Sequence, residues 1–270
     1  MKPIRVGLIG CGTIGRELAL FLTRRFSNRV SLRCVSEHRP EKAQALAREL
    51  RCKLANTSLG HLVARSDFII EAASAEAAGP AAALALKNNK SILVMSAGGL
   101  LKNKSWQRVL KKSSGTLWVP SGAVAGLDGL LAAREAGLKS VTLITRKPPE
   151  ALQGAPYFSK KKFPKLRGQT PQCVFRGSAA QAVNGFPQNV NVAAVLSLAG
   201  IGARKTRVEI WTARGLKANS HEIRIRAASG DILIRTDNRP APHNPKTSAL
   251  AFYSAMALLR KIFSAARVGT

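Results

Sequence analysis

Acidic residues, aromatic residues and paired cysteines are all scarce in this chain of 270 residues. Asp and Glu number 14 against 43 Lys and Arg, so the formal net charge is +29 and anionic partners are favoured. Aromatic residues make up only 5 %, so a core must be built mainly from Ala, Leu, Val and Ile. The four cysteines form no Cys-x-x-Cys pair, which argues against a zinc site or a disulfide framework. A hydrophobic content of 46 % excludes a disordered chain.

Long apolar runs are also missing. None approaches the roughly 18 to 20 residues that a membrane-spanning helix needs. The first residues are too charged, and their apolar run is too short, for a signal peptide. We therefore expect a cytoplasmic globular protein of one or two domains, with no contact to a membrane.

The first hundred residues alternate between short apolar runs and segments whose apolar residues recur at helical spacing. The runs predict strands and the spaced segments predict helices. The predicted strands cover 4–9, 30–35, 68–73 and 91–95, and the predicted helices cover 14–26, 40–50 and 75–88. Such alternation predicts an α/β fold that begins with a doubly wound parallel sheet, a Rossmann domain.

A Gly-x-Gly-x-x-Gly motif lies between the first predicted strand and the first predicted helix. In a dinucleotide-binding turn, Gly10 permits the tight turn, Gly12 lets the pyrophosphate approach the backbone, and Gly15 lets helix and strand pack closely. The start of the helix at Thr13 and Ile14 would receive the phosphate charge. The alternative is an ordinary strand-to-helix turn.

The residues after the second predicted strand bear on which cofactor binds. Glu37, 22 positions after Gly15, can accept a hydrogen bond from the ribose 2′-hydroxyl of NAD. Arg39, together with Ser36, can instead hold the 2′-phosphate of NADP. Both cofactors stay open, with Glu37 favouring NAD.

From about residue 120 the pattern changes, and a glycine-rich crossing at 121–129 leads into new strands. The hairpin predicted there has its turn at Ser229-Gly230-Asp231, and the last helix is predicted to be capped by Thr247 or Ser248. The predicted strands are 140–146, 205–213, 221–227 and 231–236, and the predicted helices are 188–200 and 248–266.

Several segments of the chain resemble the L-aspartate dehydrogenase family, which is related in architecture to dihydrodipicolinate reductase and homoserine dehydrogenase. The segments occur in the family's order and run nearly end to end. They are Val6–Gly15, Glu71–Ser74, Ser121–Ala123, Thr145–Pro149, Phe175–Ala179, Phe186–Ala194, Asn219–Ile223, Asn238–Pro240 and Asn244–Ser248.

The resemblance implies NAD(P)-dependent oxidative deamination of L-aspartate to iminoaspartate, which water converts to oxaloacetate and ammonium, or the reverse amination. In bacteria and archaea such enzymes can feed iminoaspartate to NAD biosynthesis. The resemblance also implies a Rossmann domain at 1–122, joined by a C-terminal helix at 245–270. An α+β substrate and oligomerisation domain, built on an open mixed sheet, would occupy 123–244, and the family is usually dimeric.

Histidine suits the chemistry, because hydride leaves the α-carbon only after the α-ammonium group has lost a proton. His38 lies beside the nucleotide turn, His61 in a predicted surface helix and His243 in a Pro-Asn loop. Only His221 occupies the family's Asn-x-His-Glu strand position, so we expect it to be the general acid/base. The alternative is a structural histidine on a strand.

The remaining cofactor candidates follow from strand geometry and from the resemblance. Asn219 shares a sheet face with His221, and by resemblance it contacts the nicotinamide together with the backbone around Ala123. Ala73, Ser74 and Ala97 follow the ends of parallel strands, where nucleotide and substrate meet in this fold. The alternative for these three is strand-to-helix turn chemistry.

A substrate with two carboxylates needs cationic or well-oriented N–H donors. The family-matching cations are Arg146, Lys147 and Lys246, and Asn191 is a further polar candidate. Lys246 immediately precedes the last predicted helix, whose N-terminus adds positive potential. In so basic a chain, each of these cations has a solvated surface residue as its alternative. No metal site is expected.

The net charge of +29 exceeds what binding a dicarboxylate substrate would require. Residues 156–168 are basic, contain aromatics and are flanked by prolines, so we expect an exposed loop that could contact nucleic acid or an acidic partner. No nucleic-acid-binding motif is present, and a generally basic surface with nonspecific, salt-sensitive affinity for RNA is the alternative. Two other functions stay open: a related Rossmann oxidoreductase for another amino or oxo acid, and a non-catalytic nucleotide- or nucleic-acid-associated protein.

Overall fold

The computed structural model describes residues 2–159, 161–166, 168–187, 190–241, 244–265 and 268–269. The chain divides into two compact units. Unit 1 comprises Met1–Pro120 and Ala255–Arg267, and unit 2 comprises Ser121–Ser254 and Val268–Thr270. Within the described residues, no helix is long and apolar enough to cross a lipid bilayer.

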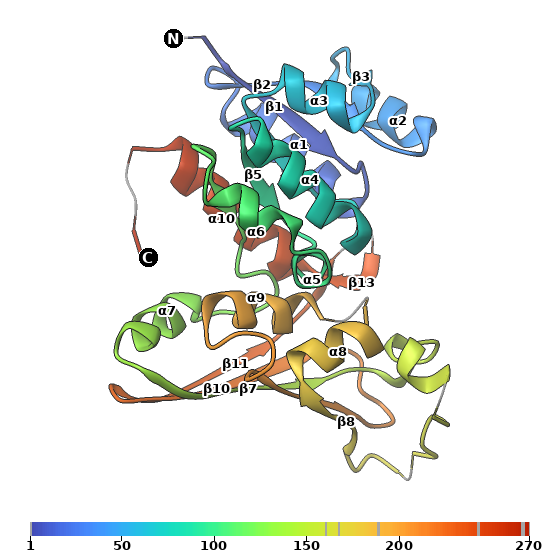
Figure 1. The fold of residues 1–270 in the computed structure, drawn as a ribbon. Coiled ribbons are helices and arrows are strands. Elements are labelled where there is room, and N and C mark those ends of the chain that lie inside the picture. The colour runs from blue at the N-terminus through green and yellow to red at the C-terminus, as the bar shows by residue number, and fades with distance from the viewer. Residues whose placement is uncertain are drawn as a thin grey trace. The chain divides into compact units, whose positions relative to one another are not determined.

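Unit 1 contains a six-stranded sheet in which all neighbouring strands are parallel (Figure 1). Its order, β3-β2-β1-β4-β5-β6, is that of a dinucleotide-binding fold, so the expected Rossmann sheet is confirmed. The strands are β1 (Ile4–Ile9), β2 (Val30–Ser36), β3 (Ala55–Asn56), β4 (Phe68–Glu71), β5 (Ser91–Val94) and β6 (Leu117–Trp118). The helices are α1 (Thr13–Arg25), α2 (Pro40–Leu50), α3 (Leu59–Arg65), α4 (Ala75–Lys87), α5 (Ala97–Lys102) and α6 (Ser105–Leu110).

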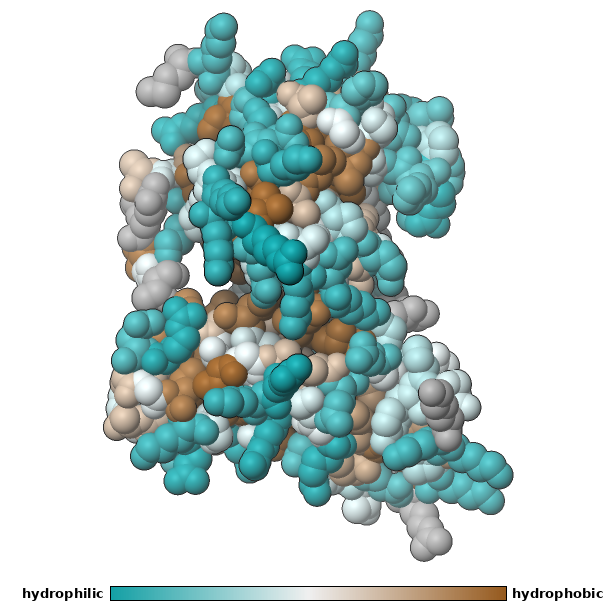
Figure 2. All heavy atoms as spheres, viewed as in Figure 1, coloured by the Kyte–Doolittle hydropathy of each residue, from teal (hydrophilic) through white to brown (hydrophobic). Residues whose placement is uncertain are grey.

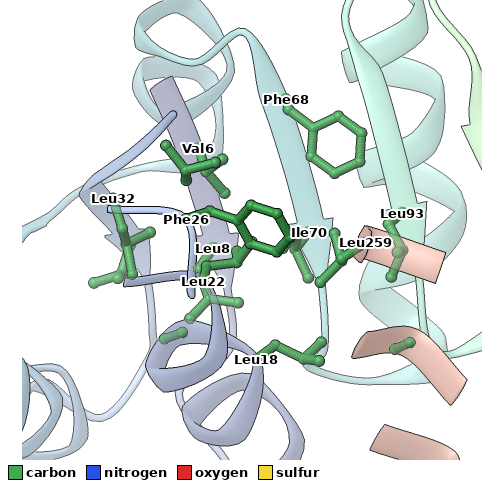
Figure 3. Packing of buried hydrophobic residues seen from close by; sticks show 14 of the residues in the cluster. Val6, Leu8, Leu18, Leu22, Phe26, Leu32, Phe68, Ile70, Leu93 and Leu259 are labelled. Carbon is green, nitrogen blue, oxygen red and sulfur yellow. The ribbon is translucent and has the colours of Figure 1, made fainter. Parts of the chain in front are cut away.

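The core of unit 1 is aliphatic around the central strands and aromatic near the end of the last helix, α10 (Ala249–Phe263). Figure 3 shows Leu8, Ile70 and Leu259 lying close together in this core. The ring of Phe263 lies 5.9 Å from that of Phe26 and 5.4 Å from that of Phe68. The last nine residues of α10 therefore complete the core of a sheet that begins at residue 4.

Unit 2 is built on a mixed sheet of order β11-β10-β7-β9-β8, as expected. Strands β7 and β9 are parallel, and the other neighbours are antiparallel. Helices α7, α8 and α9 pack on this sheet or on one another (Figure 1). The strands are β7 (Leu138–Arg146), β8 (Gln172–Ser178), β9 (Arg207–Thr212), β10 (Ser220–Ala227) and β11 (Gly230–Asp237). The helices are α7 (Leu127–Glu135), α8 (Ala179–Gly185) and α9 (Asn191–Ala199), and β12 (Pro240–Ala241) pairs antiparallel with β13 (Asn244–Ser248).

Three details differ from the sequence prediction. The β10–β11 turn lies at Ala228-Ser229, because Ala227 pairs with Gly230 and the turn is one residue tighter than predicted. Helix α9 begins at Asn191, and residues 188–189 of the predicted helix lie outside the described part of the chain. The hydroxyl oxygen of Ser248 has no hydrogen-bond partner in that part, so Ser248 does not cap α10.

In the basic segment 156–168, the described lysines are exposed and the aromatic residues are partly buried. The ring centroid of Tyr157 lies 5.1 Å from that of Phe186, which is fully buried. The ring centroid of Phe158 lies 4.8 Å from that of Phe163. These rings therefore contribute to the packing of unit 2. Lys160 and Arg167 lie outside the described residues. Hydrophilic side chains cover most of the surface visible in Figure 2, in keeping with the net charge of +29.

Candidate functional site

The turn between β1 and α1 has a different requirement at each of its three glycines. Gly10 has φ of +88°, which favours glycine. A Cβ atom at Gly15 would collide with the carbonyl oxygen of Gly10, so this position needs glycine for close packing. A Cβ atom at Gly12 would meet nothing within 4 Å. Space therefore lies open above Gly12, where α1 begins with Thr13 and Ile14.

Glu37 ties the end of β2 to this turn. Its Oε2 accepts a hydrogen bond of 2.7 Å from the Cys11 N–H, and its Oε1 accepts one of 3.0 Å from the Arg39 N–H. Partial burial raises the pKa of Glu37, but these backbone bonds, together with the charges of Lys42 and Arg39, outweigh it and the net pKa is lowered. The side chain is therefore an anion beside the glycine turn, and Arg39 is exposed next to it.

A buried carboxylate, Glu71, organises the next two turns of unit 1. Its side chain accepts hydrogen bonds from the N–H groups of Ala73 (2.8 Å), Ser74 (3.1 Å) and Ser96 (3.0 Å), and from the Ser96 hydroxyl (2.9 Å). Burial raises the pKa of Glu71, and these hydrogen bonds oppose the rise. Ser74 also caps α4, and Ala97 is the buried first residue of α5. Both helices therefore start from turns fixed by one side chain.

His221 lies on β10, almost completely buried at 4 % exposure, and is paired across the sheet with Thr145 of β7. The Thr145 hydroxyl lies 2.8 Å from Nδ1 of His221. Burial, and then the charge of Lys147, lowers the pKa of His221 to about 3. The imidazole is therefore neutral at pH 7, and it becomes a stronger base only when an anion bound nearby raises this pKa.

Lys147 follows the end of β7, two residues after Thr145, and is 7 % exposed. Its backbone is held on both sides, because its N–H donates to the Trp211 carbonyl (3.0 Å) and its carbonyl accepts from the Thr212 hydroxyl (2.8 Å). Burial lowers the pKa of Lys147 to about 8. Within the described residues no carboxylate forms an ion pair with its ammonium group. A buried cation that lacks a counter-charge favours an anionic ligand.

Asn219 and Ala123 lie in the same corner of unit 2 as His221. The Ala123 carbonyl accepts from Asn238 Nδ2 at 2.9 Å and from the Thr236 hydroxyl at 3.4 Å, and Thr236 pairs with His221 across the sheet. The Asn238 N–H donates to the Asn219 carbonyl. The side-chain oxygen of Asn219 is buried and has no hydrogen-bond partner in the described chain. An orphaned acceptor of this kind points to a missing donor.

The other candidates for substrate binding are Arg146, Asn191 and Lys246. Arg146 lies on the opposite face of the sheet from His221, because neighbouring strand residues alternate, and it pairs with Glu222 at 3.5 Å. Asn191 is exposed at the first residue of α9. The backbone of Lys246 lies in β13, and its side chain is outside the described part of the structure, as is His243.

The residues present fit a nicotinamide dinucleotide. Gly12 leaves open space at the start of α1, where pyrophosphate binds in this fold, and Glu37 is an anion at the end of β2, where the ribose hydroxyls bind. The orphaned oxygen of Asn219 suits the carboxamide N–H₂ of a nicotinamide. Within unit 1, the residues at the start of α1 could therefore hold the pyrophosphate.

Four residues of these clusters were not singled out from the sequence. Thr145 and Asn238 lie within matching segments of the family resemblance, yet nothing local shows that they contact His221 or Ala123. Thr236 is placed by strand register alone. Glu71 opens a matching segment and ends an apolar run, and its isolated charge is a local signal that could have identified it.

Comparisons with known proteins cover both units. Residues 128–262 match the family model described as "Aspartate dehydrogenase, C-terminal", and residues 10–116 match "Homoserine dehydrogenase, NAD binding domain". The chain is 38 % identical over 271 residues to an L-aspartate dehydrogenase of Methanosarcina mazei, covering 99 % of this chain and 100 % of that one. It is 35 % identical over 270 residues to L-aspartate dehydrogenase 3 of Bordetella bronchiseptica, covering 100 % of this chain and 98 % of the relative.

Solved structures agree on the fold. The crystal structure of aspartate dehydrogenase from Thermotoga maritima superimposes with a TM-score of 0.72 at 24 % identity, covering 99 % of this chain and 100 % of that chain. A hyperthermophilic archaeal homoserine dehydrogenase in complex with NADPH superimposes with a TM-score of 0.60 at 10 % identity, covering 96 % and 97 %. The resemblance noted from the sequence is confirmed by the family models and the full-length relatives. The chain is an oxidoreductase of the L-aspartate dehydrogenase family.

Proposed function

We propose that this protein oxidises L-aspartate with NAD⁺ or NADP⁺ to iminoaspartate, which water converts to oxaloacetate and ammonium, and that it also runs the reverse amination. The observation that carries the proposal is the buried pair of His221 and Lys147. A neutral base beside an uncompensated cation suits a substrate that carries both an ammonium group and carboxylates. Iminoaspartate formed in this way would be available to NAD biosynthesis.

Lys147 and His221 have separate roles in unit 2. The Lys147 ammonium binds a substrate carboxylate, which supplies its missing counter-charge. The same carboxylate raises the pKa of His221, because a nearby anion favours the imidazolium form. His221 takes the proton from the α-ammonium group at Nε2, and the lone pair left on nitrogen assists departure of hydride from the α-carbon. When bound, the nicotinamide ring supplies the hydride acceptor.

Hydrolysis of the imine uses the same base. The hydride step leaves a protonated imine, and His221 releases the proton it has taken to solvent. The neutral imidazole then takes a proton from the water that attacks the imine carbon and passes it to the amino nitrogen of the carbinolamine formed. The C–N bond breaks, the hydroxyl proton moves to the departing ammonia, and ammonium and oxaloacetate result. In the direction of amination the same proton transfers run in reverse.

For the cofactor we propose a preference for NAD. The ionised carboxylate of Glu37 repels a 2′-phosphate and accepts from a ribose hydroxyl, whereas Arg39 is exposed and offers its N–H to Glu37. The ratio of kcat/KM for NAD⁺ and NADP⁺ tests this. A Glu37→Ala variant is expected to lower the ratio by about tenfold, as expected for loss of one charge-assisted hydrogen bond.

We also propose a homodimer formed through unit 2. The face of its sheet opposite His221 carries Leu233, which is 70 % exposed, and the half-exposed Trp211. Light scattering of the wild type and a Leu233→Asp variant tests this interface. A dimer that becomes a monomer in the variant is expected, and a wild-type monomer would contradict the proposal.

The activity is tested by absorbance of reduced nicotinamide with purified protein, NAD⁺ or NADP⁺, and L-aspartate, L-glutamate, L-homoserine or L-alanine in parallel. Reduction with aspartate well above the other amino acids is expected. Equal rates with another amino acid, or none with any of them despite cofactor binding, would contradict the proposal.

A further inference from the structure

The hydroxyl of Thr145 faces Nδ1 of His221. The two side chains are 2 % and 4 % exposed, and their oxygen-to-nitrogen distance is 2.8 Å. They meet because residues 145 and 221 pair directly in the antiparallel register of β7 and β10. Since Thr is β-branched, its side chain has few alternative rotamers on a strand.

A hydroxyl has one proton to donate, so its role at Nδ1 decides which imidazole nitrogen carries hydrogen. The Thr145 hydroxyl has a second partner, the carbonyl of Ser220 at 3.5 Å, which can only accept. If Thr145 donates to Ser220, its lone pair faces His221, and Nδ1 must carry the proton. If Thr145 donates to Nδ1 instead, Nε2 carries the proton and has no lone pair for the substrate.

The first arrangement also serves the protonated state. An imidazolium carries hydrogen on both nitrogens, so Nδ1–H must donate to Thr145 after the proton transfer. A Thr145 hydroxyl that already donates to Ser220 receives Nδ1–H before and after the transfer without rotating. The charge on His221 can then change with no rearrangement of its buried partner.

We propose that Thr145 is a positioning residue, which holds His221 with hydrogen on Nδ1 and so leaves Nε2 as the atom that takes the substrate's proton. This inference rests on the proposed function, because it assigns the atom through which that reaction runs.

Kinetics of three variants test the proposal. Thr145→Val keeps the shape but removes the hydroxyl, and is expected to lower kcat by about 100-fold, as loss of a tautomer-fixing partner does, with KM for aspartate within about twofold. Thr145→Ser keeps a hydroxyl and is expected to recover kcat to within about fivefold of the wild type. Thr142→Val, on the other face of the same strand, is the matched control and should match the wild type.

Nitrogen-15 NMR of the histidine rings gives a readout that is independent of turnover, with the His221 signals assigned from a His221→Asn variant. Hydrogen on Nδ1 in the wild type and a shift toward the other tautomer in Thr145→Val are expected. Hydrogen on Nε2 in the wild type, or full kcat in Thr145→Val, would overturn the proposal. A wild type that does not oxidise aspartate refutes the proposed function instead, while the ring spectrum still decides the role of Thr145.

Discussion

Replacing Lys147 by methionine should make the protein more stable and its aspartate binding weaker. A pKa lowered from 10.5 to about 8 corresponds to about 3 kcal/mol against the buried ammonium group. Methionine has a similar volume and no charge, so we expect Lys147→Met to raise the free energy of unfolding at pH 7 by about 1 to 3 kcal/mol. The lost charge-assisted hydrogen bond should raise KM for aspartate by about 10- to 100-fold.

The pH dependence of the free energy of unfolding tests independently whether the buried Lys147 destabilises the fold. Between pH 8 and 10.5 the folded chain has released the Lys147 proton while the unfolded chain still holds it. The free energy of unfolding contributed by this group therefore rises with pH over that window. Urea denaturation at pH 7 and pH 10 should show the rise in the wild type relative to Lys147→Met, so the stability difference between the two narrows at high pH.

Lys139→Met is the control, because Lys139 is an exposed cation on the same strand. It should change neither stability nor KM appreciably. A Lys147→Met protein that is less stable at pH 7 and retains the wild-type KM for aspartate would refute the reasoning, since Lys147 would then be a structural residue and no carboxylate anchor.

Three further predictions concern unit 1. Gly12→Ala should keep the wild-type melting temperature but weaken cofactor binding at least about tenfold in a fluorescence titration. Gly15→Ala should weaken binding and also lower the free energy of unfolding by about 1 to 3 kcal/mol, because its Cβ meets a backbone carbonyl. Equal stability of the two variants would argue against this reasoning. Burial, with the charge of Glu37, raises the pKa of Cys11 to about 11, so mass spectrometry should find it unmodified by iodoacetamide at pH 7.5, and rapid alkylation of the native protein would be the contrary result. Glu71→Gln turns an NH₂ group toward N–H donors and should lower the free energy of unfolding by about 1 to 3 kcal/mol and raise the cofactor KM, which an unaltered denaturation curve would disprove.

The strands of unit 1 are predictable because both faces of the sheet are covered, which makes them continuous apolar runs such as β4 (Phe68–Glu71). Strand β8 (Gln172–Ser178) gives no such signal. It lies at the edge of its sheet, only Phe175 among its residues is buried, and a register shift between Cys173 and Phe175 breaks its alternation.

Within the candidate site, too, some residues can be predicted from the sequence and others cannot. The glycine turn is found from residue type and spacing, which are local properties of the sequence, and His221 is found from its residue type together with the family resemblance. Thr145 acquires its role through pairing with a residue 76 positions away, and no local pattern carries that register. The lowered pKa of Lys147 likewise depends on its burial in the folded unit, so the sequence alone leaves Lys147 and Arg146 equivalent.

The measurement that tests the account most directly is single-turnover reduction of NAD⁺ by L-aspartate in the wild type and in His221→Asn, with NAD⁺ affinity measured in both. The account predicts that the variant loses at least about 100-fold in the rate of hydride transfer and binds NAD⁺ within about twofold of the wild type, because the pyrophosphate turn lies in unit 1. Hydride transfer at an undiminished rate in His221→Asn would contradict the account.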